Sequence, residues 1–187
     1  MRWDDKNAEV FVFTKKEGLL SAVAHDLKLR VERFSIEADP DKKTVHATFD
    51  AASVRVVCAL RHGAEAPDAL SARERADIER NIIKDVLRPQ KHPEIRFVAD
   101  VFDAVDDAAD DSVDDGAVVG KLTLCGVTQA VRVTRSRDEK FHVGKATLDQ
   151  RAFGIEPYSA MMGTLKIRPD VEVLVRLAKA EDETPRS

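Results

Sequence analysis

Apolar and polar residues alternate along most of this 187-residue chain, which is the pattern of β-strands that turn one face toward a core. One segment places Leu27, Leu29 and Val31 on one face, and the longest alternating series runs over residues 165–177. At Arg33 the apolar positions change phase, which predicts a bulge or bend that re-aims the second half of a long strand.

One segment has helical spacing instead. Residues 72–88 carry an apolar stripe between charged residues, which predicts a single amphipathic helix on the surface of a β protein. Ser71 and Glu74 have the spacing of a capping box at its start, and Pro89 predicts its end. The stripe consists of Ile78, Ile82, Ile83, Val86 and Leu87.

These elements add up to an all-β fold of about eight strands and one helix, joined by short turns. Strands that follow one another without helical crossovers are expected to pair antiparallel, and eight of them can close into a barrel. The interior of such a barrel is either filled by side chains or wide enough for one elongated ligand. We expect one domain over residues 1–180 and a disordered tail at 181–187.

Charge and cysteine usage exclude several classes of partner. The formal net charge of −4 argues against nucleic acid, because binding phosphates requires a basic patch. The sequence has no apolar stretch of the ~20 residues that a membrane span needs, and no basic and apolar leader. We therefore expect a cytoplasmic protein in which Cys58 and Cys125 are free thiols.

No metal site is predicted. Residues 103–115 are rich in Asp, but an EF-hand register that uses Gly116 puts Val113 where a ligand should stand. A solvated hairpin loop is the better interpretation of this run. None of the five His residues lies three or four positions from another, so no helical ligand pair exists.

Catalysis finds no support in the sequence. Ser21, His25 and Asp26 contain the residue types of a catalytic triad, but adjacent residues of a strand point to opposite faces, so Asp26 would not orient His25. Cys125 precedes a glycine and is interpreted as a structural or surface cysteine. We expect a protein that is not an enzyme.

Three short motifs carry the most specific signal. They are HPEIRF at residues 92–97, GKLTLCGVT at 120–128 and RAFGI at 151–155. In this order they resemble the motifs of the YceI-like family, the polyisoprenoid-binding, lipocalin-like proteins. Gln129 stands where that family usually has Lys or Arg, and His92 replaces a common Tyr. The matching residues are Pro93, Ile95, Phe97, Gly120, Leu122, Thr123, Leu124, Gly126, Val127, Thr128, Arg151, Phe153, Gly154 and Ile155.

The resemblance implies an extended antiparallel eight-stranded lipocalin-like barrel around a long apolar tunnel. That tunnel would hold an isoprenoid or another amphiphilic lipid, with no cofactor. The residues expected to contact the ligand are Phe11, Phe13, Leu27, Leu29, Phe97, Leu122, Leu124, Phe153, Tyr158, Met161 and Met162.

Three alternatives stay open. The same apolar residues would also appear in a barrel filled by side chains. An enzyme that acts on such a lipid would use His25 or His92 at the end of the tunnel. A scaffold would offer the charged face of the helix at 72–88 to a partner. A homodimer that forms through an edge strand is compatible with lipid binding.

Overall fold

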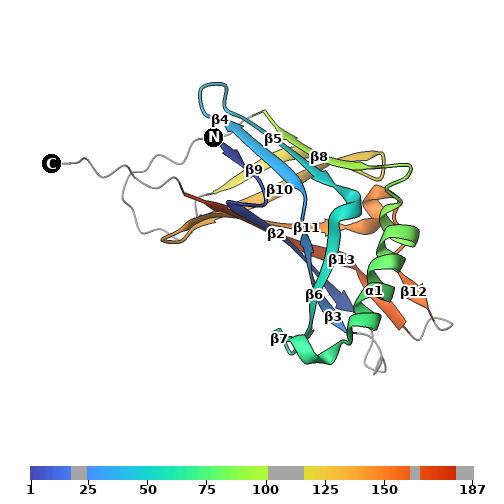
Figure 1. Cartoon of the computed structure of the whole chain (residues 1–187). Helices are drawn as coiled ribbons and strands as arrows, with labels where there is room; N and C mark the ends of the chain where they lie inside the picture. Colours follow the sequence, from blue (N-terminus) through green and yellow to red (C-terminus); the bar gives the residue numbers. More distant parts are fainter. Residues whose placement is uncertain (18–24, 101–115, 161–164, 180–187) are drawn as a thin grey trace.

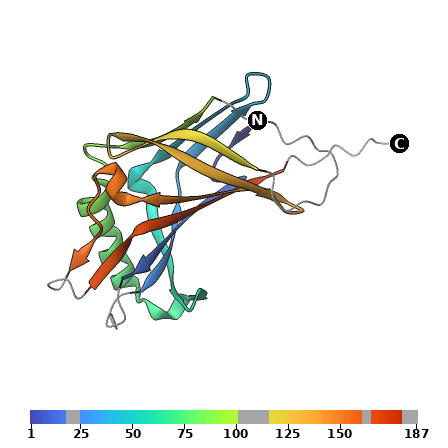
Figure 2. The same ribbon diagram turned by 180° about the vertical axis from the view of Figure 1, so that it is seen from behind.

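The computed structural model of the chain describes residues 1–17, 25–100, 116–160 and 165–179. Within this part, thirteen strands form one antiparallel sheet that curls into a barrel-like shell, and one α-helix crosses an end of it (Figure 1, Figure 2). The strands are β1 (Arg2–Trp3), β2 (Ala8–Lys16), β3 (Asp26–Val31), β4 (Phe34–Asp39), β5 (Thr44–Asp50), β6 (Val54–Arg61), β7 (Ala64–Ala66), β8 (Glu94–Ala99), β9 (Ala117–Leu124), β10 (Val127–Arg137), β11 (Phe141–Asp149), β12 (Ser159–Ala160) and β13 (Leu165–Ala178).

The sheet order is β1-β4-β5-β8-β9-β10-β11-β13-β2-β3-β6-β7, and β12 pairs with β13 beside this path. The all-β class, the antiparallel pairing and the helix are thus confirmed. The Asp-rich run at 103–115 and the tail at 181–187 lie outside the described residues. No helix among the residues described is long and apolar enough to cross a membrane.

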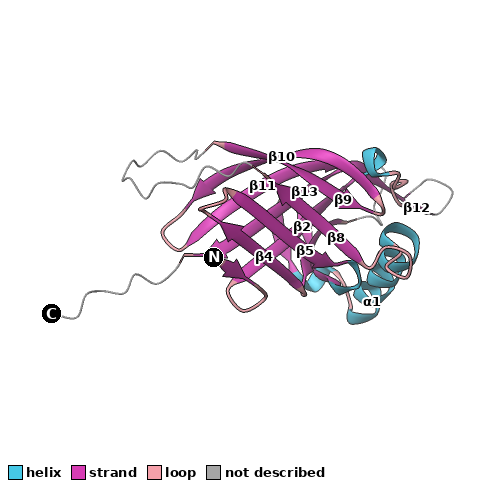
Figure 3. Cartoon of the chain, turned by 90° about the horizontal axis from the view of Figure 1, so that it is seen from above, coloured by secondary structure: helices cyan, strands magenta, loops and turns pink. Residues whose placement is uncertain are grey.

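The predicted count of eight strands is wrong. The short strands β1, β7 and β12 were not expected, and two long strands are each divided by a bend. One bend separates β3 from β4 at residues 32–33, as the change of phase predicts, and the other is the 3-10 turn η1 (Ala51–Ser53) between β5 and β6. Because β3 pairs with β6 while β4 pairs with β5, the two bends carry the chain from one end of the sheet to the other. The sheet therefore curls around an interior (Figure 3).

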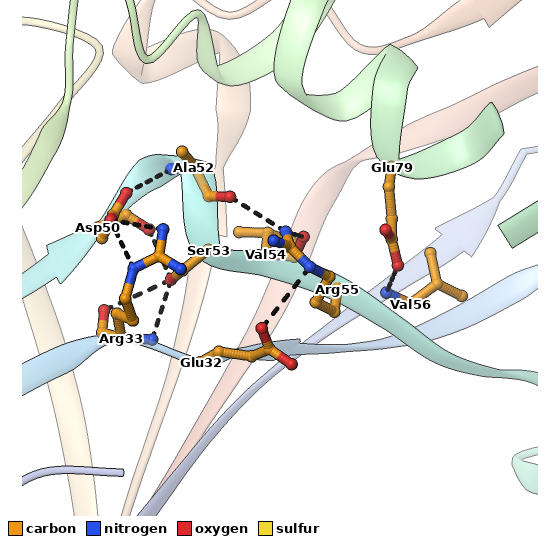
Figure 4. Close-up of polar contacts among 9 residues, drawn as sticks. All are labelled: Glu32, Arg33, Asp50, Ala52, Ser53, Val54, Arg55, Val56 and Glu79. Carbon is orange, nitrogen blue, oxygen red and sulfur yellow. Dashed lines mark hydrogen bonds and ion pairs between the residues drawn. The ribbon is translucent and has the colours of Figure 1, made fainter. Parts of the chain in front are cut away.

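Polar contacts fix these two bends against each other (Figure 4). The Ser53 hydroxyl accepts a hydrogen bond from the Arg33 N–H at 3.0 Å and donates one to the Asp50 carbonyl at 2.8 Å. The Arg33 guanidinium also pairs with the Asp50 carboxylate at 2.8 Å, and Glu32 lies 3.6 Å from Arg55. Ser53 is fully buried, so no water can replace its bonds.

We expect Ser53→Ala to lower the free energy of unfolding by about 1–2 kcal/mol, because it leaves buried backbone groups without partners. Urea unfolding measures the change. Ser159→Ala, at an exposed serine of β12, is the control and should stay within about 0.5 kcal/mol of the parent. Equal effects of the two substitutions would show that the corner does not depend on this hydroxyl.

The helix begins as predicted and ends differently. Ser71 and Glu74 form the capping box at the start of α1 (Ala72–Asn81). The chain then widens into the π-helical segment η3 (Ile82–Leu87), where the N–H of Arg88 bonds the Ile83 carbonyl at 3.0 Å. Arg88 adopts a left-handed conformation with φ of 49°, and this residue, rather than Pro89, ends the helix.

The helix also does more than cover the surface. The carboxylate of Glu79 accepts a hydrogen bond from the Val56 N–H of β6 at 2.8 Å, which holds α1 across the end of the sheet (Figure 4). The apolar stripe packs against the interior of the shell through Ile78, Ile82 and Leu87. The helix therefore closes part of one end of the curled sheet.

Candidate ligand-binding cavity

The inward faces of the strands enclose an apolar cavity of about 950 Å³. This volume lies at the upper end of the roughly 300–1,000 Å³ that small-molecule sites occupy. A filled core, in contrast, leaves few voids larger than a water molecule. Strand alternation supplies the lining: β2 contributes Val10, Val12 and Thr14, and β13 contributes Val171, Val173 and Val175.

Several lining side chains are only half-buried although they point inward. Val12, Val173 and Val175 are examples, and each belongs to a strand with neighbours on both sides. Their remaining exposure is toward the cavity, because no side chain from the opposite wall covers them. The interior of the shell is therefore hollow rather than packed.

The cavity is lined by residues of α1, such as Ile78, and of the N-terminal strand β1, such as Trp3, and these two elements lie at opposite ends of the shell (Figure 1). Leu165 and Leu177, twelve residues apart on β13, both line it, which corresponds to roughly 40 Å along an extended strand. Glu74 at one end and Met1 at the other are lining residues that are also exposed to solvent. The cavity therefore reaches the surface at both ends.

Polar side chains gather at the α1 end. His25, Glu74, Asp77, Asn81 and Tyr158 all line the cavity there. The Asn81 amide donates a hydrogen bond to the Tyr158 hydroxyl at 3.1 Å, which ties the helix to the segment that leads into β12. Hydrogen bonds from the Ser71 side chain and backbone lower the pKa of Glu74, so this carboxylate stays ionised near neutral pH.

Six of the residues expected to contact a ligand line this cavity. They are Leu27, Leu29, Phe97, Leu122, Leu124 and Tyr158. Met161 and Met162 lie outside the described residues.

The remaining three, Phe11, Phe13 and Phe153, do not line the cavity. Because Val10 and Val12 point inward, the intervening Phe11 and Phe13 must point outward. The Lys28 ammonium lies 4.3 Å from the centre of the Phe11 ring and covers it. Phe153, the last residue of η4 (Gln150–Phe153), is only 2% exposed because it packs in the buried cluster that includes Leu124 and Ile155, and it does not itself line the cavity. These three residues therefore lie outside the lining of this cavity.

Other lining residues were missing from the expected set. They include Trp3, Val10, Val12, Val31, Val54 and Val131. The phase of β2 was available as a signal, since only one of its two apolar faces can point inward. The prediction chose the aromatic residues of β2, which lie on the face that does not line the cavity.

The GKLTLCGVT motif forms the β9–β10 hairpin. Cys125 and Gly126 make a two-residue turn with φ values of 51° and 81°, which is the type I′ geometry that suits paired strands. The hydroxyls of Thr123 and Thr128 lie 2.8 Å apart across the hairpin, and neither threonine lines the cavity. Leu122 contributes to the lining from the opposite face of the same strand, so the motif both turns the chain and presents apolar surface inward.

The residues considered for metal binding and for catalysis can be located in the part of the chain described. No group of three or more His, Cys, Asp or Glu residues there has metal-binding geometry. The Asp26 carboxylate accepts a hydrogen bond from the Lys16 N–H at 2.8 Å, as part of the β2–β3 connection, and Ser21 lies outside the described residues. His92 is absent from the lining and packs near Gly126. Burial raises the pKa of both Cys58 and Cys125, which disfavours a reactive thiolate.

Solved structures with this architecture come from several bacteria. Burkholderia cenocepacia BcnA is 19% identical, with a TM-score of 0.57 over 92% of this chain and 96% of that chain. A polyisoprenoid binding domain from Saccharophagus degradans, implicated in plant cell wall breakdown, is 12% identical, with a TM-score of 0.57 over 92% and 94%. A mutant YCEI protein of Campylobacter jejuni is 16% identical, with a TM-score of 0.55 over 90% and 91%.

At these identities the solved structures establish a shared fold. A comparison with curated proteins gives no match. The family model of the YceI-like domain, in contrast, matches residues 3–178, from β1 to the last residue of β13. The family resemblance seen in the three motifs is thus confirmed over nearly the whole chain, and this protein belongs to the YceI-like family.

Proposed function

We propose that this protein binds and carries an isoprenoid-like or other amphiphilic lipid in its central cavity, without chemical conversion of that lipid. The hollow apolar interior of about 950 Å³ is the observation that carries the proposal. An elongated cavity that is open at both ends and lined mostly by Val, Leu and Ile suits a flexible hydrocarbon chain better than a compact polar metabolite.

Burial of a hydrocarbon chain supplies enough free energy for binding. Each buried methylene contributes about 0.8 kcal/mol, so a dozen of them contribute roughly 10 kcal/mol before the costs of association. Binding therefore needs no hydrogen bond for affinity. The length of the cavity and the polar groups at its ends would set specificity.

The family adds support from outside the chain. The Saccharophagus degradans structure is described as a polyisoprenoid binding domain, and the match to this chain extends over 94% of that domain. A filled barrel has no comparable support, because the side chains leave the interior open.

Native mass spectrometry of the freshly purified protein, followed by organic extraction, tests the proposal. We expect a long-chain species at near-stoichiometric occupancy, and its mass should not change during prolonged incubation with the protein. A protein that never retains or takes up a hydrocarbon chain would contradict lipid binding. A ligand that is converted would contradict carriage without catalysis.

Removing the lipid should leave a folded but less stable protein. A ligand that binds only the folded state at a hundred times its Kd adds about 2.7 kcal/mol to the free energy of unfolding. Thermal unfolding of delipidated protein, with and without added geranylgeraniol, measures this gain. The same melting temperature in both samples would show that the cavity does not bind the chain.

A further inference from the structure

The two ends of the cavity differ in charge. Glu74 and Asp77 line the α1 end, where no Lys or Arg is among the described lining residues. Asp77 is paired on its outer side with Arg80, which does not line the cavity, at 2.7 Å. Glu74, unlike Asp77, has no ion pair with an Arg or Lys side chain among the described residues. Its carboxylate accepts hydrogen bonds from the N–H and the hydroxyl of Ser71.

The opposite end is basic, and its groups also interact within the protein. Arg135 and His142 line that end, and each makes another interaction within the protein. Trp3 also lies there, and its indole N–H donates to the Ala178 carbonyl at 2.9 Å. A polar head group at this end would share Arg135 and His142 with the interactions that they already make.

The α1 end, in contrast, offers groups that can still form hydrogen bonds. Thr14 lines the cavity on β2, where it pairs with Leu27, two residues from His25. The Glu74 carboxylate is exposed at this end and has acceptor sites beyond those that its bonds to Ser71 use. The Tyr158 hydroxyl receives a bond from Asn81 and keeps its own proton for a second bond.

We propose that the lipid is oriented with its polar head at the α1 end, beside Glu74, His25 and Tyr158, and that this head donates hydrogen bonds and carries no negative charge. The inference rests on the proposed lipid binding. Alcohols and amines fit this description, because a carboxylate accepts their hydrogen bonds. A phosphate or a fatty-acid carboxylate does not fit, because bringing like charges together is unfavourable.

Three C20 probes with the same chain test the charge of the head group: geranylgeraniol, geranylgeranylamine and geranylgeranyl phosphate. Titration followed by the fluorescence of Trp3, which is the one tryptophan of the chain and a lining residue, gives each Kd. We expect the phosphate to bind at least about tenfold more weakly than the alcohol. A phosphate that binds as tightly as the alcohol overturns the inference but leaves lipid binding intact, whereas no binding of any probe contradicts the proposed function itself.

Glu74→Gln removes the charge while keeping the capping box, which Gln also supports. It should bring the Kd of the phosphate to within about threefold of the Kd of the alcohol, because the repulsion is lost. Asp85→Asn is the matched control: it removes one charge from an exposed residue of η3 that does not line the cavity, and it should leave the tenfold ratio in place. If the ratio of the two Kd values changed equally in both variants, the overall charge of the protein, rather than Glu74, would determine the weaker binding of the phosphate.

The orientation has its own measurement. Bromine quenches tryptophan fluorescence only at short range, and Trp3 lies at the end opposite α1, where its indole bonds Ala178. A C16 alcohol brominated at its far end should quench Trp3 more strongly than the same alcohol brominated beside the hydroxyl. The reverse order would place the head at the Arg135 end and overturn the inference.

Discussion

Replacing Ala146 by Phe is expected to weaken lipid binding by roughly 50-fold while the protein stays folded. Ala146 lines the cavity on β11 and pairs with Val173, which in turn pairs with Val12. These residues form a row across the wall near its middle, so a ring at this position projects into the path of the chain. Excluding three methylenes costs about 2.4 kcal/mol, or roughly 50-fold in Kd.

The neighbouring position supplies the control for this experiment. Thr147 is exposed on the outer side of β11, so Thr147→Phe adds the same ring outside the cavity. Lipid content after extraction and the Kd for geranylgeraniol are compared in the two variants, together with their thermal unfolding. If Ala146→Phe still retains the lipid of the parent protein, the ligand does not pass through the middle of the cavity.

Gly120→Ala is expected to destabilise the protein by about 3 kcal/mol, at the upper end of the usual cost of overpacking. A Cβ at Gly120 would overlap the ring of Phe97 and come within 2.8 Å of the Val98 carbonyl oxygen. The ring can shift toward the cavity, but the carbonyl belongs to β8, which pairs with β9. Part of the strain must therefore move the backbone.

Gly144→Ala is the matched control, since Gly144 also lies in a strand and its new Cβ would meet Val133 at 3.2 Å and Val175 at 3.9 Å. A side chain can yield where a backbone carbonyl cannot, so the loss should remain below about 1 kcal/mol. Urea unfolding of both variants measures the difference. Equal losses would show that the close approach of β9 to β8 does not explain this glycine of the GKLTLCGVT motif.

Features that depend on neighbouring residues could be predicted from the sequence. The alternation identified the long strands, the change of phase at Arg33 located the bend before β4, and Ser71 with Glu74 marked the start of α1. Each of these depends on contacts within a few residues. The family could be identified from the motifs at 92–97, 120–128 and 151–155. Each of these motifs contains a glycine or a buried side chain that the local backbone conformation or packing requires.

The division of the strands needed the pairing of distant segments. A bend at Ser53 is stabilised by bonds to residue 33, and the divided strands β3/β4 and β5/β6 exist only because the two bends lie together. The α-helix α1 likewise ends at Asn81, where the chain continues as the π-helical segment η3. In η3, Ile82 and Leu87 line the cavity and contact residues that are distant in the sequence. No short window of sequence contains these partners.

The sequence by itself determined the β class, the bend, the capped helix and the family. Tertiary structure alone decided which face of β2 points inward, and so replaced Phe11 and Phe13 by Val10 and Val12 in the lining. Both faces of that strand are apolar, so only the curl of the whole sheet distinguishes inside from outside. The same curl leaves the interior hollow, because whether apolar side chains from opposite walls meet depends on the distance between the walls and not on their hydrophobicity.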